Sequence, residues 1–191
     1  MKNPVILLLI FVFVYNHLSA QTVKAIIVQL NTDQNQVRYL QRTGNTKEAE
    51  SISNEATIAS KKMISDFSDN FSYCPVYYFI DTNTDLIRNK QFDNVLLNAD
   101  GTPVKKIILN PSDSNYLTVR YGYSDAASAV STCQGITVST DKFEKVFFFP
   151  SCDKQKSDKK YLFISRKYDI KYFGSAAALN TEIKKKYDES R

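Results

Sequence analysis

The chain has little of the chemistry on which many enzymes depend. It contains one histidine, His17, and no tryptophan in 191 residues. His17 lies in an N-terminal segment that we expect to be removed, and the mature protein then has no side chain that titrates near neutral pH without perturbation. A serine or cysteine nucleophile could not use the usual imidazole base. Histidine-based zinc sites are excluded for the same reason.

Glycine motifs and paired cysteines are also missing. The sequence has no Gly-x-x-x-x-Gly-Lys loop, no Gly-x-Gly-x-x-Gly fingerprint and no Cys-x-x-Cys pair. The common phosphate cradles and dithiol redox sites are therefore not encoded, and we expect no cofactor. Five glycines and five prolines leave no room for a long flexible linker. We expect a single globular domain over residues 21–191.

The first twenty residues have the pattern of a secretory signal peptide. Lys2 precedes an unbroken apolar run over residues 5–14, and a short polar segment ends at Ala20. A basic start, an apolar core and a small residue before the cut are typical of such signals. We expect cleavage between Ala20 and Gln21, and a periplasmic or extracellular location. The apolar run is too short to span a bilayer, so we expect no transmembrane segment in the mature chain.

The charge of the chain favours an anionic partner. The formal net charge is +5 and falls to +4 when Lys2 is removed. In an exported protein this balance favours contact with envelope components and argues against nucleic acid.

Three cysteines remain after the expected cleavage. Export allows disulfides, and an odd number leaves one thiol unpaired or pairing between chains. Cys133 and Cys152 flank a sequence with the pattern of two adjacent strands, so they are the tentative pair; three free thiols are the alternative. Cys74 precedes an apolar run and has the surroundings of a buried, structural thiol. A reactive Cys74 is the rival hypothesis.

The first half of the mature sequence predicts a parallel crossover unit. Residues 24–30 and 75–81 are short apolar runs typical of buried strands. Helices are expected over residues 34–43 and from Asn45 onwards, with Asn45 and Glu48 spaced as a capping box. The second helix has an apolar stripe and an opposite polar face that includes Asp66. The stripe consists of Ala49, Ile52, Ala56, Ala59, Met63 and Phe67.

The second half predicts hairpins and a C-terminal helix. One or two helical turns are expected before Lys90, and Asp100-Gly101 has the pattern of a hairpin turn. The final helix begins at Ser175 and buries Leu179, Ile183 and Tyr187. The expected later strands cover residues 94–97, 104–109, 116–123, 136–139, 146–149 and 161–166. Together these patterns predict an α/β fold with a mixed β-sheet, an early β-α-α-β crossover, later hairpins and a C-terminal helix.

The candidate site residues lie just after the second predicted strand. Asp81, Asn83 and Asp85 alternate as the first three ligands of a calcium loop do, but Leu86 and Phe92 occupy the places of the turn glycine and the bidentate acid. We therefore expect no metal there. The loop still follows the carboxyl end of a parallel strand, where α/β proteins bind ligands, so these three residues are the ligand-binding candidates.

Segments 73–81, 93–101 and 116–123 resemble small exported proteins of Bacteroidetes-type bacteria. The resemblance covers most of the mature chain and implies no activity, cofactor or catalytic residue. We expect a non-catalytic exported module that binds a protein or cell-envelope partner. The alternative is a histidine-free hydrolase or transferase that uses acidic residues in the loop from Asp81 to Asp85.

Overall fold

The computed structural model describes residues 22–123, 134–150 and 175–187. The described residues form one α/β domain, as the sequence predicts. Its elements are, in chain order, β1 (Ala25–Leu30), α2 (Gln34–Arg42), α3 (Thr46–Asn70), β2 (Val76–Ile80), the short 3₁₀ helix η1 (Asp81–Asn83), α4 (Thr84–Arg88), β3 (Tyr116–Tyr123), β4 (Gln134–Ser139), β5 (Lys145–Pro150) and α5 (Ser175–Tyr187).

The described strands form one mixed sheet in the order β2-β1-β3-β4-β5. β1 pairs in parallel with both β2 and β3, whereas β3, β4 and β5 pair antiparallel. The predicted β-α-α-β crossover and the β4–β5 hairpin are therefore confirmed. The connection after β1 leads to β2 on one side of β1, and the connection after β2 leads to β3 on the other side. This reversal creates a topological switch point between β1 and β3.

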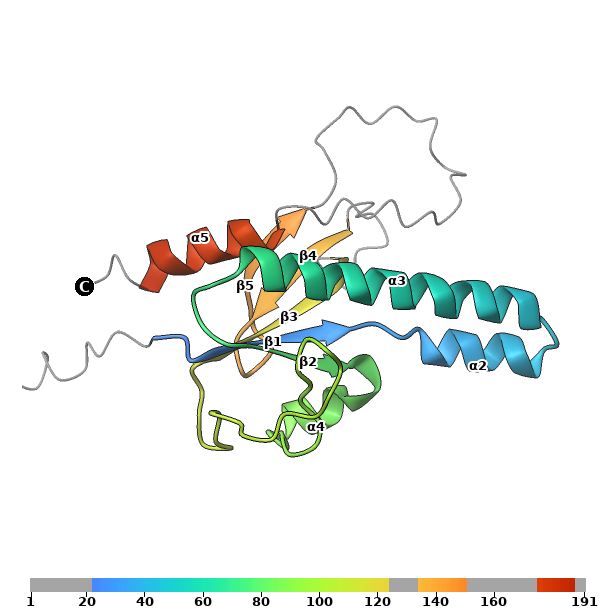
Figure 1. The fold of residues 1–191 in the computed structure, drawn as a ribbon, viewed down its shortest axis with the longest axis horizontal. Coiled ribbons are helices and arrows are strands. Elements are labelled where there is room, and N and C mark those ends of the chain that lie inside the picture. The colour runs from blue at the N-terminus through green and yellow to red at the C-terminus, as the bar shows by residue number, and fades with distance from the viewer. Residues whose placement is uncertain (1–21, 124–133, 151–174, 188–191) are drawn as a thin grey trace, which may run out of the picture.

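Helices α3 and α5 cover one face of the sheet (Figure 1). Alternate residues of β1 point toward these helices, because successive side chains of a strand point to opposite faces. Ile26 and Val28 pack with Phe67 of α3 and with Leu179 and Ile183 of α5 in one buried cluster. Phe67 is fully buried, which stabilises the fold by about 1.5–3 kcal/mol relative to an exposed ring.

The other face of the sheet is covered by α4 and the segment that leads to β3 (Figure 1). Ile27 of β1 and Phe79 of β2 point this way and pack against Ile87, Phe92 and Leu96. β1 and β2 are therefore apolar on both faces, as is typical of parallel strands between two covering layers.

Helix α2 and the first half of α3 project beyond the carboxyl end of β1 (Figure 1). We call α2 together with residues 46–58 of α3 the arm. The helices of the arm turn at Gly44, whose φ of +83° is readily adopted only by glycine. The described residues that are fully buried within the arm are Leu40, Ala49 and Ala56.

Two predicted strands are wrong. Within residues 94–97 only Leu97 forms isolated bridges, to Tyr78 and to Pro103, and the described residues 104–109 form none. The predicted turn is present, since the amide of Gly101 donates to the carbonyl of Asn98 at 3.0 Å. The flanking apolar residues do not extend the sheet because their side chains fill the core beneath α4, where Leu96 and Leu109 are buried.

Two details of α3 also differ from expectation. The side chain of Asn45 makes no capping hydrogen bond within the described structure, so the capping box is wrong. Asp66 is buried rather than exposed, because α5 packs over the end of α3 and its backbone meets this carboxylate.

Several predictions concern residues outside the described ranges: the signal segment 1–20 with its cleavage between Ala20 and Gln21, the strand 161–166, and the pair Cys133 and Cys152. Within the described ranges, none of the helices is both long enough and apolar enough to cross a bilayer.

Candidate functional site

The carboxyl ends of β1 and β2 bring two polar segments to the same edge of the sheet. Asn31, Thr32 and Asp33 follow β1, and Asp81 follows β2 directly. The register aligns Leu30 with Ile80, so the residues that follow these two positions leave the sheet together. This is the edge at which open α/β sheets bind ligands.

A hydrogen bond joins the two segments. The hydroxyl of Thr32 donates to Oδ1 of Asp81, and the amide of Thr82 donates to the same oxygen at 3.0 Å. The hydroxyl of Thr84 donates to the carbonyl of Asp81 at 2.6 Å. These contacts fix Asp81 at the end of β2 and give its carboxylate a defined orientation.

The three predicted site residues do not form one cluster. Asp81 is half-buried and contacts Thr32, whereas the side chain of Asp85 is 88% exposed and lies 3.6 Å from Arg88. Asn83 precedes α4 and makes no capping hydrogen bond with its side chain in the described structure. Among the described residues there is also no group of three or more side chains placed to hold a metal ion.

A groove of about 480 Å³ opens beside these segments, between α2 and α3. Its floor contains Leu30 and Ile80 from the ends of β1 and β2, and its walls come from the two helices. The helix residues that line the groove are Gln34, Val37, Arg38 and Gln41 of α2, with Ser53, Ala56, Thr57, Ser60, Lys61 and Ile64 of α3. A groove of this size falls in the range of ordinary ligand sites.

A separate, smaller cavity lies next to the groove, on the side of the topological switch point. Its volume is about 20 Å³, it shares Leu30, Asn31, Ala56 and Ser60 with the groove, and it reaches Tyr121 of β3. The hydroxyl of Ser60 donates to the carbonyl of Asn31 at 3.1 Å. This bond holds α3 against the end of β1, so the floor of the groove is tied to one of its walls.

The charged groups of the lining are both cationic. Arg38 stands on α2 and Lys61 on α3. Arg38 donates to the side-chain oxygen of Gln34 at 2.9 Å, which occupies one of its five donors. Neither cation forms an ion pair with a described residue. The groove therefore offers positive charge on both walls, with no carboxylate among its lining residues.

Cys74 lies away from this edge, at the start of β2, and is half-buried beneath α3. Burial raises the pKa of its thiol to about 12. The thiol is therefore protonated at neutral pH, and this argues against a reactive thiolate. The structure supports the packing interpretation of Cys74 from the sequence.

Sequence reasoning pointed to the edge of the sheet beside which the groove lies, but it did not predict the groove. Its lining combines the end of β1, the two helices that follow it and Ile80 of β2. One signal was available: Gln34, Arg38 and Gln41 are spaced as one polar face of a helix. That face alone does not reveal that Thr57 and Lys61 lie opposite.

No protein-family model, curated protein or solved structure matches the chain.

Proposed function

We propose that the protein is an exported, non-catalytic module that binds a protein or cell-envelope partner in the periplasm or outside the cell. The partner docks in the groove between α2 and α3. The main support is the position of this groove, at the edge of the sheet where the parallel strands β1 and β2 end.

The sparse packing of the arm also supports a binding role. Within α2 only Leu40 is fully buried, and Ala49 and Ala56 are the buried residues on the facing part of α3. Helices gain most of their stability from packing an apolar face, so this pair adds little to the core. A projecting arm that contributes little to stability, but supplies one wall of a groove and part of the other, is suited to binding.

The proposal is tested by filling the groove. Thr57→Trp places a large ring in the groove from an exposed helix position, and Asn54→Trp places the same ring on the exposed surface of α3 outside the lining. The mature chain is incubated with envelope fractions of its own cells, and bound protein is measured by co-sedimentation. We expect saturable binding that T57W weakens by about tenfold or more, a loss of about 1.4 kcal/mol. We expect N54W to bind as the unaltered chain does. Equal binding by both variants, or no saturable binding at all, contradicts the proposal.

A hydrolase or transferase without histidine is a second candidate, favoured by the contact between Thr32 and Asp81. A carboxylate that accepts a hydroxyl proton is the arrangement of a general base beside a nucleophile. Thr32 also lines the groove, so its hydroxyl is close to any bound ligand.

The second candidate is tested with Asp81→Asn. The amide oxygen of asparagine still accepts the hydrogen bond from Thr32 but is a far weaker base. Asp85→Asn is the matched control, since Asp85 is exposed and pairs with Arg88. An activity on ester, glycoside or phosphoester substrates that D81N abolishes and D85N retains, at unchanged melting temperature, would support this candidate. An activity that survives D81N rules out Asp81 as the base.

A further inference from the structure

We infer that the groove between α2 and α3 takes an acidic, extended peptide segment of a protein partner. This inference rests on the proposed function and names the chemistry of the ligand. It is carried by the two cations on opposite walls, the apolar floor and the side-chain amides that line the same groove.

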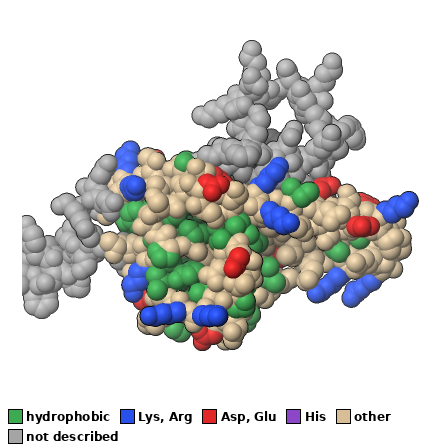
Figure 2. Space-filling model, in the orientation of Figure 1, with side chains coloured by type: hydrophobic (Ala, Val, Ile, Leu, Met, Phe, Trp, Pro, Cys, Tyr) green, Lys and Arg blue, Asp and Glu red, His purple; other side chains and the backbone are tan. Residues whose placement is uncertain are grey.

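Arg38 and Lys61 supply the charge complementarity. Both side chains belong to residues that are exposed, both line the groove, and neither is paired with a described carboxylate. Figure 2 shows both basic and acidic side chains over the arm, so the charge complementarity rests on the lining of the groove itself. A carboxylate between the walls gains charge-assisted hydrogen bonds from both cations without displacing an existing ion pair.

Two acids that follow or precede the lining residues in sequence are already engaged. Asp81 follows the floor residue Ile80, but its carboxylate accepts hydrogen bonds from Thr32 and from the amide of Thr82. Asp33 precedes α2 and also has an interaction within the protein. Neither acid lines the groove, so both cations face the ligand.

The other lining groups favour a peptide over a glycan. Gln34 and Gln41 carry amides that can pair with backbone N–H and C=O groups of an extended chain. Val37 and Ile64 form apolar surface suited to aliphatic side chains between the acids. No aromatic ring is among the residues that line this groove, and sugars are commonly held by stacking on such rings.

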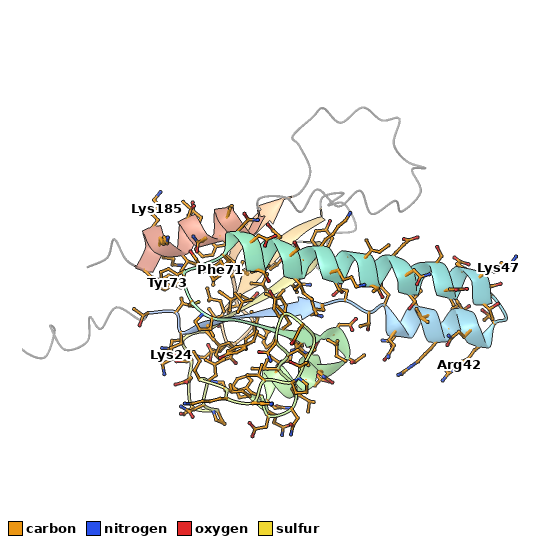
Figure 3. All side chains as sticks on the ribbon, in the orientation of Figure 1. Lys24, Arg42, Lys47, Phe71, Tyr73 and Lys185 are labelled. Atoms are coloured by element: carbon orange, nitrogen blue, oxygen red, sulfur yellow. The ribbon has the colours of Figure 1, made fainter. Side chains whose placement is uncertain are left out.

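The arm provides a matched control for net charge. Arg42 and Lys47 lie at the far tip of the arm (Figure 3), on the same two helices as Arg38 and Lys61 and outside the groove lining. The double variants R38Q/K61Q and R42Q/K47Q each remove two positive charges. A difference between them reports on the groove, because the effect of net charge is the same for both.

The probe is a fluorescein-labelled peptide of alternating Glu and Leu, six residues long, measured by fluorescence anisotropy on the full mature chain. Peptides with Gln or Lys in place of Glu are the comparisons. We expect the Glu peptide to bind saturably and the other two at least about tenfold more weakly. R38Q/K61Q should weaken binding of the Glu peptide by about tenfold or more, and R42Q/K47Q should weaken it by less than about twofold. Added salt should also weaken this binding, because it screens the charges. Equal loss in the two double variants, or no preference for Glu, overturns the inference.

Failure of this inference can be separated from failure of the proposed function. If T57W abolishes envelope binding while the Glu peptide neither binds nor competes, the groove is a docking site for another ligand and only the inference fails. Competition by a polyuronate such as alginate, with none by the Glu peptide, assigns the groove to an anionic glycan and also overturns it. If T57W leaves envelope binding intact, the proposed function itself fails.

Discussion

The ammonium group of Lys90 lies 3.1 Å from a carboxylate oxygen of Asp141 and joins two parts of the chain that are far apart in sequence. The same ammonium donates to the carbonyl of Asp113 at 2.9 Å and lies 6.0 Å from the ring centre of Tyr116. One cation therefore joins three parts of the chain: the segment after α4, the β4–β5 turn and the segment before β3. Asp113 is held in turn by Lys24, at 2.9 Å.

Removing the charge of Asp141 should destabilise the fold more than removing an exposed charge. The side chain of Asp141 is 10% exposed and that of Asp85 is 88% exposed. Asp141→Asn removes the counter-charge of the partly buried ammonium of Lys90 and leaves only a neutral amide oxygen in its place, so we expect a loss of about 1–3 kcal/mol. Asp85→Asn, the matched substitution, should cost less than about 0.5 kcal/mol. Urea denaturation measures both, and equal effects would show that Lys90 and Asp141 do not stabilise this edge.

Asp66 should be required for the docking of α5. Its carboxylate accepts from the amide of Ala176 in the first turn of α5 at 3.2 Å and from the side chain of Asn70 at 2.9 Å. Asp66→Ala removes the acceptor for a helix-start amide, and we expect a loss of about 1–2 kcal/mol. Hydrogen exchange of the α5 amides should accelerate more than that of β1. Asp69→Ala is the control, since Asp69 is exposed and accepts a hydrogen bond from Ser65 on the same helix. Equal exchange in the two variants contradicts the role of Asp66.

Asp66 also illustrates which parts of the fold could be predicted from the sequence. Local patterns were sufficient for the main elements: β3 has the predicted bounds, and the stripe that ends at Phe67 faces the core. Asp66 lies beside that stripe and carries a charge, so the pattern assigns it to the solvent face. Its burial depends on α5, more than a hundred residues away, and no local periodicity contains that information.

The candidate site was predicted only in part for the same reason. The carboxyl end of β2 was identified because the crossover pattern predicts that β1 and β2 run parallel. Alternation in the sequence suggested that Asp81 and Asp85 act together, but the side chain of Asp85 is exposed and lies beside Arg88. The contact of Asp81 is with Thr32, which lies at the end of a different strand. Such contacts depend on strand register, which a single sequence does not fix.

Gly44 should be the most sensitive position in the arm. It has a φ of +83°, and a Cβ built there meets no described heavy atom within 4 Å. The cost of a side chain is therefore conformational rather than steric. Gly44→Ala should destabilise the protein by about 1 kcal/mol, while Gly44→Asn should cost less because asparagine tolerates the left-handed region. Chemical denaturation measures both, and an alanine variant as stable as the unaltered chain would show that the turn between α2 and α3 relaxes.

The buried thiol of Cys74 should make stability fall in alkaline solution. Its pKa is about 12 in the fold, whereas an exposed thiol titrates near 8.5. Below about pH 8.5 the thiol is protonated in both the folded and the unfolded chain. The stability that the neutral, buried thiol contributes is then fully present. Above that pH the unfolded chain loses a proton that the folded chain keeps, so the free energy of unfolding decreases until the pH approaches about 12.

Tyr116 contributes to the same trend, because burial and the nearby charge of Asp141 raise its pKa to about 12. Cys74→Ser isolates the thiol, since serine does not titrate in this range and the tyrosines are unchanged. We expect the stability of the unaltered chain relative to C74S to be constant up to about pH 8 and to decrease between about pH 9 and 11. Urea titrations at each pH measure the difference.

The same protonated thiol should be alkylated by iodoacetamide at pH 8 far more slowly in the native than in the unfolded chain, as read by peptide mass mapping. If the stabilities of the unaltered chain and of C74S change in parallel with pH, and Cys74 is alkylated rapidly in the native chain, the thiol is exposed to solvent. That result contradicts both the expected pH dependence and the expected slow alkylation.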